Sequence, residues 1–333
     1  MDIIESRQLF LDACRRTPVP RPPVWLMRQV GRYMPRYQEL KKRASFADLL
    51  ARADLAAECS LYVLDDFDPD AVIVFSDILT VLGALGASVS YEPSLTVRAD
   101  LANLAATPDE DRLAPCYEAL ASLAATLGKK KALIGFAGAP FTLFHYLIGD
   151  GEAVRTTLVR DPEGSRRIID TLAKAVAFHL RRQAEAGADV LQVFDSHMGE
   201  LSARQYEQFA LPALLAVLEE LDDLECPRIV FGRGRHHLEH KDKLQGHVLS
   251  VDWTVPLERI EGASALAVQG DLDPAILRAG PDATRAETEV MLAHARRFGG
   301  YIANLGHGVL PRTPMESVQA FVATVKNFSM GGA

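Results

Sequence analysis

Eight short apolar runs, separated by helix-like segments, constrain most strongly what this chain can fold into. They occupy residues 23–28, 71–77, 132–138, 190–196, 228–232, 247–253, 265–271 and 301–307. Most are near-continuous in Val, Ile, Leu, Ala and Phe, which is typical of parallel strands covered on both faces. Apolar residues at three- and four-residue spacing predict helices at 46–64, 115–127, 162–186, 203–221, 286–297 and 314–326. The sequence thus predicts strands that alternate with helices.

This alternation predicts one α/β domain over residues 1–333, a single (β/α)8 TIM barrel with a short N-terminal helical segment at 3–16. A doubly wound open sheet is the alternative. The barrel is favoured because polar residues lie at or near strand ends, which a barrel gathers on its C-terminal rim. These residues are Arg28, Asp77, Ser196, Asp252, Gln269 and His307.

Two local features of the helices are also predicted. Asp161 and Thr313 each precede a proline, so each is expected to cap a helix whose first residue is that proline. The gaps between the fifth, sixth and seventh strands are short, so the helices there should be small or partly 3₁₀.

Composition and charge exclude several classes of protein. The 333 residues carry a formal net charge of −8, which disfavours binding to nucleic acid or to an acidic membrane. The N-terminus lacks the layout of a signal peptide, and the longest apolar stretch, 132–149, is interrupted by Pro140 and His145. The four cysteines are scattered without CxxC spacing, which predicts buried free thiols in a reducing compartment. We expect a cytoplasmic protein.

The first predicted strand runs into an unusual polar segment, residues 28–33, which reads RQVGRY. An apolar strand needs no arginine at its end for stability. The guanidinium groups of Arg28 and Arg32 are rigid forks of donors that stay charged, and they predict a grip on substrate carboxylates. For a polyanionic substrate, a chain with net charge −8 must collect its basic groups in one pocket.

Asp77 and His307 are the strongest candidates for chemistry at the other strand ends. Asp77 is interpreted either as the cap of the next helix or as a buried acceptor for substrate N–H groups, kept ionised by Arg28 and Arg32. His307 stands between Gly306 and Gly308, and glycines do not build a core. A hydrogen-bonding or proton-transfer role is therefore more natural for His307.

Other motifs point away from common enzyme classes. The small-residue segment 135–143 has neither GxGxxG nor GK[ST], so it favours close approach of backbone to a large flat ligand over a nucleotide site. Ser196 and His197 are adjacent on a strand end and point to opposite sides, so they do not form a nucleophilic dyad. Tyr146, taken alone, is more typical of packing than of catalysis.

A histidine-rich segment, residues 236–240, has the sequence HHLEH and looks superficially like a metal site. His236 and His240 would share a helical face, but the order HExxH is absent and Arg233 and Arg235 would repel a cation. We interpret the segment as a solvated basic patch, and no metal site is predicted.

Several separated segments, in order, resemble the uroporphyrinogen decarboxylase family. They are PVWLMRQVGRYMPRY (23–37), VFSDILTVLGALG (74–86), GFAGAPFTL (135–143) with Tyr146 after it, FDSHMGELS (194–202), VDWTVPL (251–257), VQGDLDP (268–274) and NLGHGVLP (304–311). The resemblance implies a (β/α)8 barrel that is usually a homodimer. It implies cofactor-free removal of CO2 from the four acetate side chains of uroporphyrinogen III, giving coproporphyrinogen III on the route to haem.

The same resemblance implies roles for individual residues. It assigns catalysis to Asp77, Arg28, Tyr146 and His307. It assigns substrate binding to Arg28, Gln29, Arg32, Lys41, Asp77, Tyr146, Ser196 and His307. The chain departs from the family pattern at Gln38 and Lys41, where arginines are common, and at Phe144, His145, Met198 and Asp271.

Two alternative functions stay open at this point. One is a zinc-dependent corrinoid or coenzyme M methyltransferase of the same superfamily, but its His-x-Cys and distant Cys set cannot be assembled when the last cysteine is Cys226. The other is a non-catalytic tetrapyrrole-binding protein, against which the presence of both Asp77 and Arg28 argues.

Overall fold

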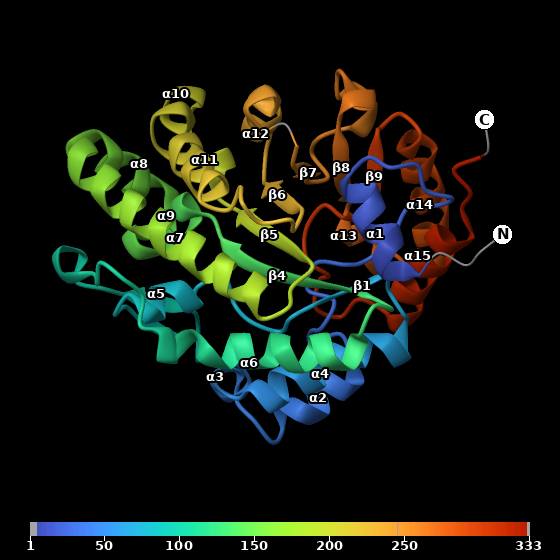
Figure 1. The fold of residues 1–333 in the computed structure, drawn as a ribbon, viewed down its shortest axis with the longest axis horizontal. Coiled ribbons are helices and arrows are strands. Elements are labelled where there is room, and N and C mark those ends of the chain that lie inside the picture. The colour runs from blue at the N-terminus through green and yellow to red at the C-terminus, as the bar shows by residue number, and fades with distance from the viewer. Residues whose placement is uncertain (1–4, 245, 332–333) are drawn as a thin grey trace.

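A single curled sheet of seven parallel strands forms the centre of the molecule in the computed structural model, which describes residues 5–331 apart from residue 245 (Figure 1). The strand order is β1-β4-β5-β6-β7-β8-β9. The bounds are β1 Ala71–Ile73, β4 Ala132–Gly138, β5 Val190–Asp195, β6 Arg228–Gly232, β7 Val248–Val251, β8 Ala267–Leu272 and β9 Gly300–Leu305. The α/β architecture with parallel strands is therefore confirmed.

The first predicted strand, 23–28, was wrong as a regular strand. It forms only an isolated parallel bridge between Val24 and Ala303. Pro22 and Pro23 have no N–H to donate to a ladder, and Arg28 leaves the extended region with φ 55°. In the described residues the main sheet therefore has seven strands rather than eight.

Residues 23–25 nevertheless lie between the two outer strands of the sheet. Trp25 N and Ala303 N donate to Ala303 O and Pro23 O, while Asp70 N donates to Val24 O at 2.8 Å. Asp70 anchors this segment because its fully buried carboxylate accepts from both Arg21 terminal nitrogens, from Val24 N and from Ser6 Oγ, at 2.7–2.9 Å.

Helices cover the outside of the sheet (Figure 1). They are α1 Ser6–Cys14, α2 Pro35–Lys41, α3 Phe46–Ala51, α4 Ala53–Asp66, α5 Thr80–Ala84, α6 Glu110–Leu127, α7 Pro140–Ile148, α8 Gly151–Arg160, α9 Pro162–Glu185, α10 Ala203–Gln205, α11 Leu211–Glu219, α12 His236–Glu239, α13 Pro274–Arg278, α14 Pro281–Ala295 and α15 Met315–Asn327. A π-helical turn, η3 Tyr206–Ala210, joins α10 to α11.

Several helix boundaries differ from the sequence prediction. The predicted helix 46–64 is two helices, because Arg52 is extended between α3 and α4. The Asp161 cap is confirmed, since its side chain accepts from Gly164 N. The Thr313 cap was wrong: α15 begins one residue later with Pro314 as its N-cap, and the Thr313 hydroxyl donates to Leu310 O instead.

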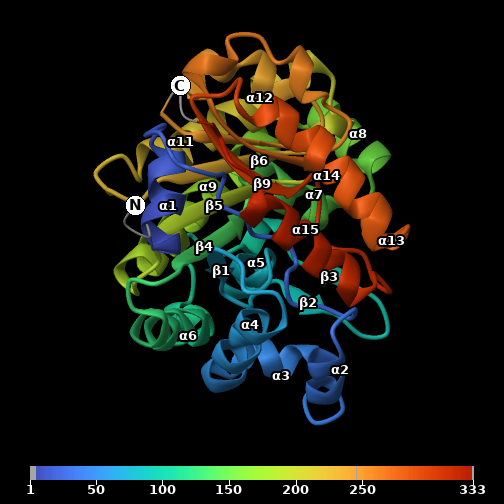
Figure 2. The ribbon, with the colours of Figure 1, turned by 90° about the vertical axis from the view of Figure 1, so that its right-hand side faces the viewer.

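The connections between β6, β7 and β8 contain only short helical pieces, as predicted. They are α12, with four residues, and the 3₁₀ turns η4 Lys241–Leu244, η5 Leu257–Arg259 and η6 Ala263–Ala265. Figure 2 shows α13, α14 and α15 together beside β9, whereas α2, α3 and α4 lie below the sheet.

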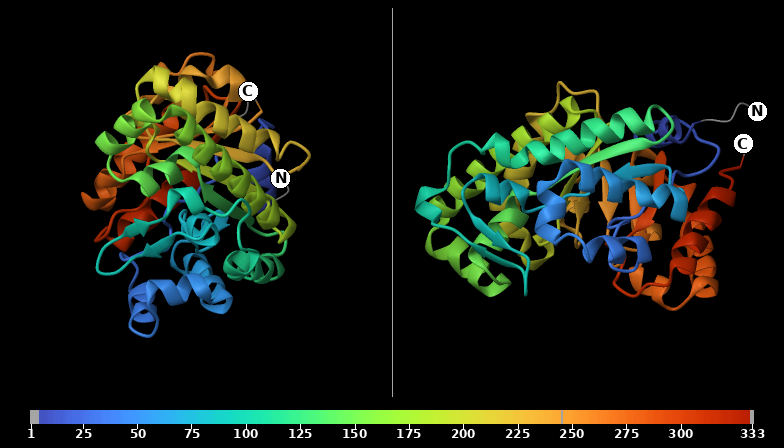
Figure 3. Two further views of the ribbon diagram at one scale, coloured as in Figure 1. Left: turned by 90° about the vertical axis from the view of Figure 1, so that its left-hand side faces the viewer. Right: turned by 90° about the horizontal axis from the view of Figure 1, so that it is seen from below.

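A small antiparallel hairpin lies apart from the main sheet. Its strands are β2 Ser88–Ser90 and β3 Thr96–Arg98, with Val89 opposite Val97. The hairpin projects at the end of the molecule away from the chain termini (Figure 3). It carries Tyr91 and Glu92 in its loop.

The sheet interior contains polar side chains that bond across strands. Gln269 is fully buried in the middle of β8, where it accepts from Trp25 Nε1 and donates to Ser250 Oγ, both at 2.8 Å. The prediction that Gln269 lies at the strand-end rim was therefore wrong. Gln269 stands in an uninterrupted run of small and apolar residues. The sequence therefore does not show whether it lies in the middle of the strand or at its end.

The structure also bears on the predictions about membrane-spanning segments and about the cysteines. Across residues 5–244 and 246–331, no helix combines the length and hydrophobicity that crossing a bilayer requires. All four cysteines are free thiols; Cys14, Cys59 and Cys116 are buried and Cys226 is partly exposed.

Candidate active site

A cleft of about 600 Å³ lies at the carboxyl ends of the strands, within the usual size of small-molecule sites, about 300–1,000 Å³. Phe136 of β4, Phe194 of β5 and Phe231 of β6 form one apolar wall. Their neighbouring ring centroids are 5.6 and 5.8 Å apart, in edge-to-face and tilted contacts. This aromatic wall suits a large ligand with flat apolar rings.

Cationic side chains face the same cleft. Arg28, Arg32 and Lys41 all line it, from the segment that follows residue 27 and from α2. Lys41 Nζ lies 3.5 Å from a carboxylate oxygen of Glu92, in the hairpin loop. The chain thus concentrates positive charge in one pocket despite a net charge of −8.

The backbone at Arg28 is held by its packing against Gly308. Arg28 has a left-handed φ of 55°, and Met27 O accepts from Val309 N at 2.9 Å. A Cβ added at Gly308 would lie 2.4 Å from Arg28 Cδ and 3.0 Å from Arg28 Cβ. Gly308 therefore leaves the space through which the Arg28 side chain passes.

Asp77 lies in the cleft just after β1. Its Oδ1 accepts from Leu79 N at 2.8 Å, so it shapes the turn into α5, and the Tyr91 hydroxyl is close enough to affect its pKa. Burial raises the pKa of Asp77, while the Leu79 N–H, the Tyr91 hydroxyl and the Arg28 charge lower it. The capping and acceptor interpretations of Asp77 are therefore compatible.

Tyr91 is a cleft residue that the sequence analysis missed. Its hydroxyl reaches Asp77 from the hairpin loop, and its ring packs edge-on against Phe46 with centroids 4.7 Å apart. Burial raises the pKa of Tyr91, and the Asp77 charge adds to this effect. No local pattern distinguishes this tyrosine, because only the folded hairpin brings it to Asp77.

His307 lies in the cleft between two aromatic rings. Phe231 and Trp253 are both edge-on to its imidazole, with centroids 6.3 and 6.2 Å away. Burial lowers the pKa of His307 to about 4, and the charges of Arg28 and Arg233 act in the same direction. The imidazole is therefore neutral near pH 7 and offers one donor and one acceptor.

Gln29 and Ser196 also line the cleft. Gln29 is fully buried, and within the described chain neither its side-chain nitrogen nor its oxygen has a hydrogen-bond partner. A buried amide without partners is available to a ligand. Ser196 is positioned through its backbone, since its N–H donates to Thr142 Oγ1, which in turn donates to Asp195.

Tyr146 differs from the other predicted site residues, because it is outside the set of described residues that line the cleft. It belongs to α7, and its ring is perpendicular to that of His197 at 5.2 Å. Burial raises the pKa of Tyr146; the Asp77 charge raises it further, whereas the Arg28 charge lowers it. Tyr146 is therefore close enough to Asp77 and Arg28 for both charges to act on its hydroxyl, although it does not belong to the described lining of the cleft.

The small-residue segment at 135–143 has a packing explanation. A Cβ at Gly135 would lie 2.6 Å from Gln183 Oε1 of α9. Gln183 uses that space to accept from Phe136 N and donate to Phe136 O. The space beside Gly135 is thus taken by the helix that covers β4, and the interpretation as a ligand approach was wrong for this glycine.

The prediction that the histidine-rich segment is a solvated patch was wrong, because the segment packs against the buried ring of Tyr206. His236 and His240 stack on the Tyr206 ring with centroids 5.0 and 5.7 Å away. His237 is fully buried and bonds Ser250 O at 3.0 Å.

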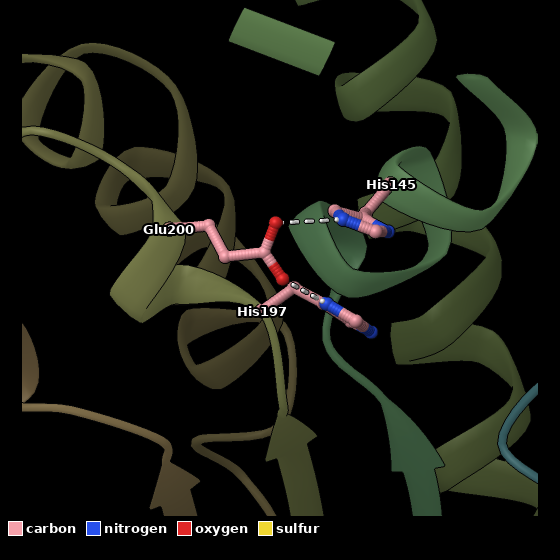
Figure 4. A group of neighbouring side chains, drawn as sticks. All are labelled: His145, His197 and Glu200. Carbon is pink, nitrogen blue, oxygen red and sulfur yellow. Dashed lines mark hydrogen bonds and ion pairs between the residues drawn. The ribbon is translucent and has the colours of Figure 1, made fainter. Parts of the chain in front are cut away.

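One group of three potential metal ligands occurs in the part of the chain that the structure describes. It consists of His145, His197 and Glu200, which converge on one another (Figure 4); Tyr146 and Ser196 are the neighbours of the two histidines in the sequence. His236 and His240 do not join such a group there; they lie near Glu239 and Glu207 respectively.

The curled parallel sheet and its strand-end cleft define a class of α/β enzyme-like proteins with a site for a large anionic ligand. The uroporphyrinogen decarboxylase (URO-D) family model matches residues 5–328. The uroporphyrinogen decarboxylase of Anaeromyxobacter sp. (strain Fw109-5) is 35% identical over 341 residues, covering 96% of this chain and 98% of that protein. The chain therefore belongs to the uroporphyrinogen decarboxylase family.

Further comparisons agree with this membership. The uroporphyrinogen decarboxylase of Streptomyces coelicolor is 39% identical over 334 residues, covering 95% of this chain and 93% of that protein. Among solved structures, a methyltransferase from Methanosarcina mazei superposes with a TM-score of 0.82 and covers 97% of this chain and 99% of its own. At 19% identity, that likeness establishes the fold alone.

Proposed function

We propose that this protein removes CO2 from the four acetate side chains of uroporphyrinogen III to give coproporphyrinogen III, as a carboxy-lyase of haem biosynthesis without a cofactor. The observation that carries the proposal is the cleft itself, in which Arg28, Arg32 and Lys41 face an aromatic wall around Asp77. A tetrapyrrole with eight carboxylates has flat rings for the wall and anionic side chains for the cations. The names of the relatives support the same reaction.

In this proposal each acetate side chain loses its carboxylate as CO2 after the pyrrole ring gains a proton. The protonated ring is an iminium sink that takes the electron pair of the breaking C–C bond. A second proton then converts the exocyclic methylene to a methyl group while the ring proton is released, so each cycle consumes one proton net. Asp77 accepts the central pyrrole N–H groups and stabilises the ring cation in a water-poor cleft.

The other residues bind and orient the substrate. Arg28 and Arg32 pair with carboxylates through bidentate hydrogen bonds, and Lys41 supplies a further positive charge. Arg28 acts as a clamp rather than as the proton donor, because a guanidinium group stays protonated in proteins and is a very weak acid. Neutral His307, Ser196 and the unpartnered amide of Gln29 add hydrogen bonds.

We assign a catalytic role to Tyr146 because of the charged groups that surround it. It lies within reach of the Asp77 and Arg28 charges, although it is not among the described residues that line the cleft.

The proposal extends to the whole chain. Residues 1–333 form one domain, and the bridged segment 23–28 closes the seven-stranded sheet into an eight-stranded barrel; the backbone bonds of Pro23, Val24 and Trp25 to both outer edges support this. The family resemblance supports a homodimer, and free thiols support the cytoplasm. Light scattering on the purified protein measures the dimer directly.

The test is anaerobic incubation of pure, metal-stripped protein with uroporphyrinogen III, followed by chromatography of the oxidised porphyrins. A ladder of seven-, six-, five- and four-carboxylate products is expected. Unchanged eight-carboxylate substrate with folded protein would reject the reaction. Binding of that substrate without turnover would instead indicate the tetrapyrrole-binding alternative.

A further inference from the structure

Three side chains behind the cleft wall form a compact His–His–Glu cluster. His145 Nε2 lies 3.1 Å from one carboxylate oxygen of Glu200, and His197 Nδ1 lies 2.8 Å from the other (Figure 4). The two imidazole rings are stacked, with centroids 3.7 Å apart and planes at 15°. His145 is buried and His197 is partly buried, whereas the Glu200 side chain is 40% exposed, so the cluster opens to solvent on the side of the carboxylate.

The atoms of this cluster have the chemistry and spacing of a metal site. Two imidazole nitrogens and one carboxylate oxygen are the donor set of zinc and other borderline divalent ions. The ligand atoms lie within 4.8 Å of one another. Two ligands of a tetrahedral zinc ion, at about 2.1 Å each, are about 3.4 Å apart. The widest pair therefore has to close by up to about 1.4 Å.

We propose that His145, His197 and Glu200 bind one divalent transition-metal ion of the zinc type beside the cleft. The ion replaces the protons that the two imidazoles now donate to Glu200, and it leaves at least one coordination position for water. It links α7 to the turn after β5 and so fixes the neighbours of its ligands, Tyr146 and Ser196. The proposed decarboxylation uses no step through this ion.

Three features of the cluster lower its expected affinity for zinc below that of a structural zinc site. His145 Nδ1 is buried and has no hydrogen-bond partner in residues 5–244 and 246–331, whereas zinc-bound histidines usually donate that second N–H. Arg155 donates to Glu200 O at 3.3 Å, which brings a positive charge near the ion. The stacked rings also have to splay before both nitrogens aim at one point. A micromolar dissociation constant is therefore expected.

The site is distinct from the cysteine-containing zinc set of the methyltransferase alternative. Its ligands are two histidines and a glutamate, and the described residues place no cysteine in the group. Zinc bound here therefore does not support the methyltransferase function.

The experiment titrates metal-stripped, full-length protein with zinc chloride by calorimetry and with cobalt(II) chloride by visible absorption. Wild type should bind one equivalent of zinc and give a cobalt ligand-field spectrum. Glu200→Gln keeps the shape of the side chain but removes its charge, and it should weaken zinc binding at least tenfold; His197→Gln should do the same. Zinc should raise the Tm of wild type but not of Glu200→Gln.

The matched control is His240→Gln. His240 Nε2 also faces a carboxylate, Glu207 at 3.4 Å, but lies outside the cluster. This variant should bind zinc as tightly as wild type does. Circular dichroism verifies that each variant is folded. Absence of zinc binding by wild type, or equal binding by folded Glu200→Gln, would overturn the proposal. All readouts are binding readouts, so they are independent of whether the protein turns over uroporphyrinogen.

Discussion

At the scale of single residues, the cleft depends on contacts that set the charge of Asp77. The Tyr91 hydroxyl is a donor beside this carboxylate and lowers its pKa, which favours the ionised form. Tyr91→Phe removes the donor and raises the pKa of Asp77 further. If ionised Asp77 stabilises the ring cation, the acid limb of kcat/KM should move to higher pH in the variant.

The pH profile of kcat/KM between pH 5 and 8 measures this shift. Tyr62→Phe is the matched control, because the Tyr62 hydroxyl also donates to a carboxylate, that of Glu58, on the protein surface. Its profile should coincide with that of wild type. A Tyr91→Phe profile identical to wild type would mean that Tyr91 has no influence on the group that limits activity at low pH.

The close packing of Gly308 against the Arg28 side chain is the second contact that a single substitution can test. In Gly308→Ala the new methyl carbon would lie 2.4 Å from Arg28 Cδ and 2.6 Å from Arg28 Cγ, so the arginine has to leave its position. Because clamped carboxylates lose their orientation, kcat/KM should fall at least tenfold, while the far-UV circular dichroism stays unchanged.

Gly83→Ala is the control for this substitution. Gly83 lies in α5, and a Cβ there would meet no atom within 4 Å. Activity should be retained and Tm should stay equal or rise slightly, because alanine favours a helix. Full activity of Gly308→Ala would show that Arg28 does not need its observed position.

The candidate site was partly accessible from sequence because some of its residues stand at or just after the ends of apolar runs. Arg28, Asp77, Ser196 and His307 have this local signal, and the structure brings them around one cleft. Tyr91 lacks it, since it reaches Asp77 only through the fold of a hairpin. The His145–Glu200 contact was equally hidden, because it joins residues 55 positions apart on two elements.

At the scale of elements, Asp70 holds the segment that bridges the two outer strands. Its fully buried carboxylate accepts from Arg21, Val24 N and Ser6. Asp70→Ala leaves these donors without their acceptor, and breaking such a buried pair costs about 3–5 kcal/mol. Urea unfolding at pH 7 should report a loss of this size in the free energy of unfolding.

Asp54→Ala serves as the comparison for Asp70→Ala. Asp54 pairs with Arg52 on the surface, where both side chains are more than half exposed. Its removal should leave the unfolding midpoint nearly unchanged, because exposed ion pairs contribute little. Equal midpoints for the two variants would refute the anchoring role of Asp70.

The elements themselves were predicted where the local pattern and the tertiary environment agree. Apolar strands such as Ala132–Gly138 and Gly300–Leu305 are covered on both faces, so composition identifies them. The segment 23–28 is also apolar, but in the described residues it forms one isolated bridge, Val24 to Ala303, and no regular strand, since Pro22 and Pro23 lack donors. Periodicity likewise continues through Arg52, although the backbone there is extended between two helices.

At the scale of the whole molecule, a chain of net charge −8 has to attract a substrate that is itself a polyanion. The proposed solution is local: Arg28, Arg32 and Lys41 concentrate positive charge at the cleft. Attraction of this kind weakens as salt shortens the Debye length from about 10 Å at 0.1 M to about 3 Å at 1 M. KM for uroporphyrinogen should therefore rise several-fold over that range, whereas kcat should change little.

Two neighbouring lysines allow the effect of the charge at the cleft to be distinguished from the effect of the overall charge. Lys41 lines the cleft, whereas Lys42 pairs with Glu39 on the exposed face of the same segment. Lys41→Gln and Lys42→Gln alter the net charge equally, so a response to overall charge would be the same in both. If the attraction comes from the positive charge at the cleft, Lys41→Gln should raise KM at low salt and make KM less dependent on salt. Lys42→Gln should have the same KM as wild type at each salt concentration. Matching salt curves for the two variants would place the attraction in the overall charge and remove Lys41 from the substrate site.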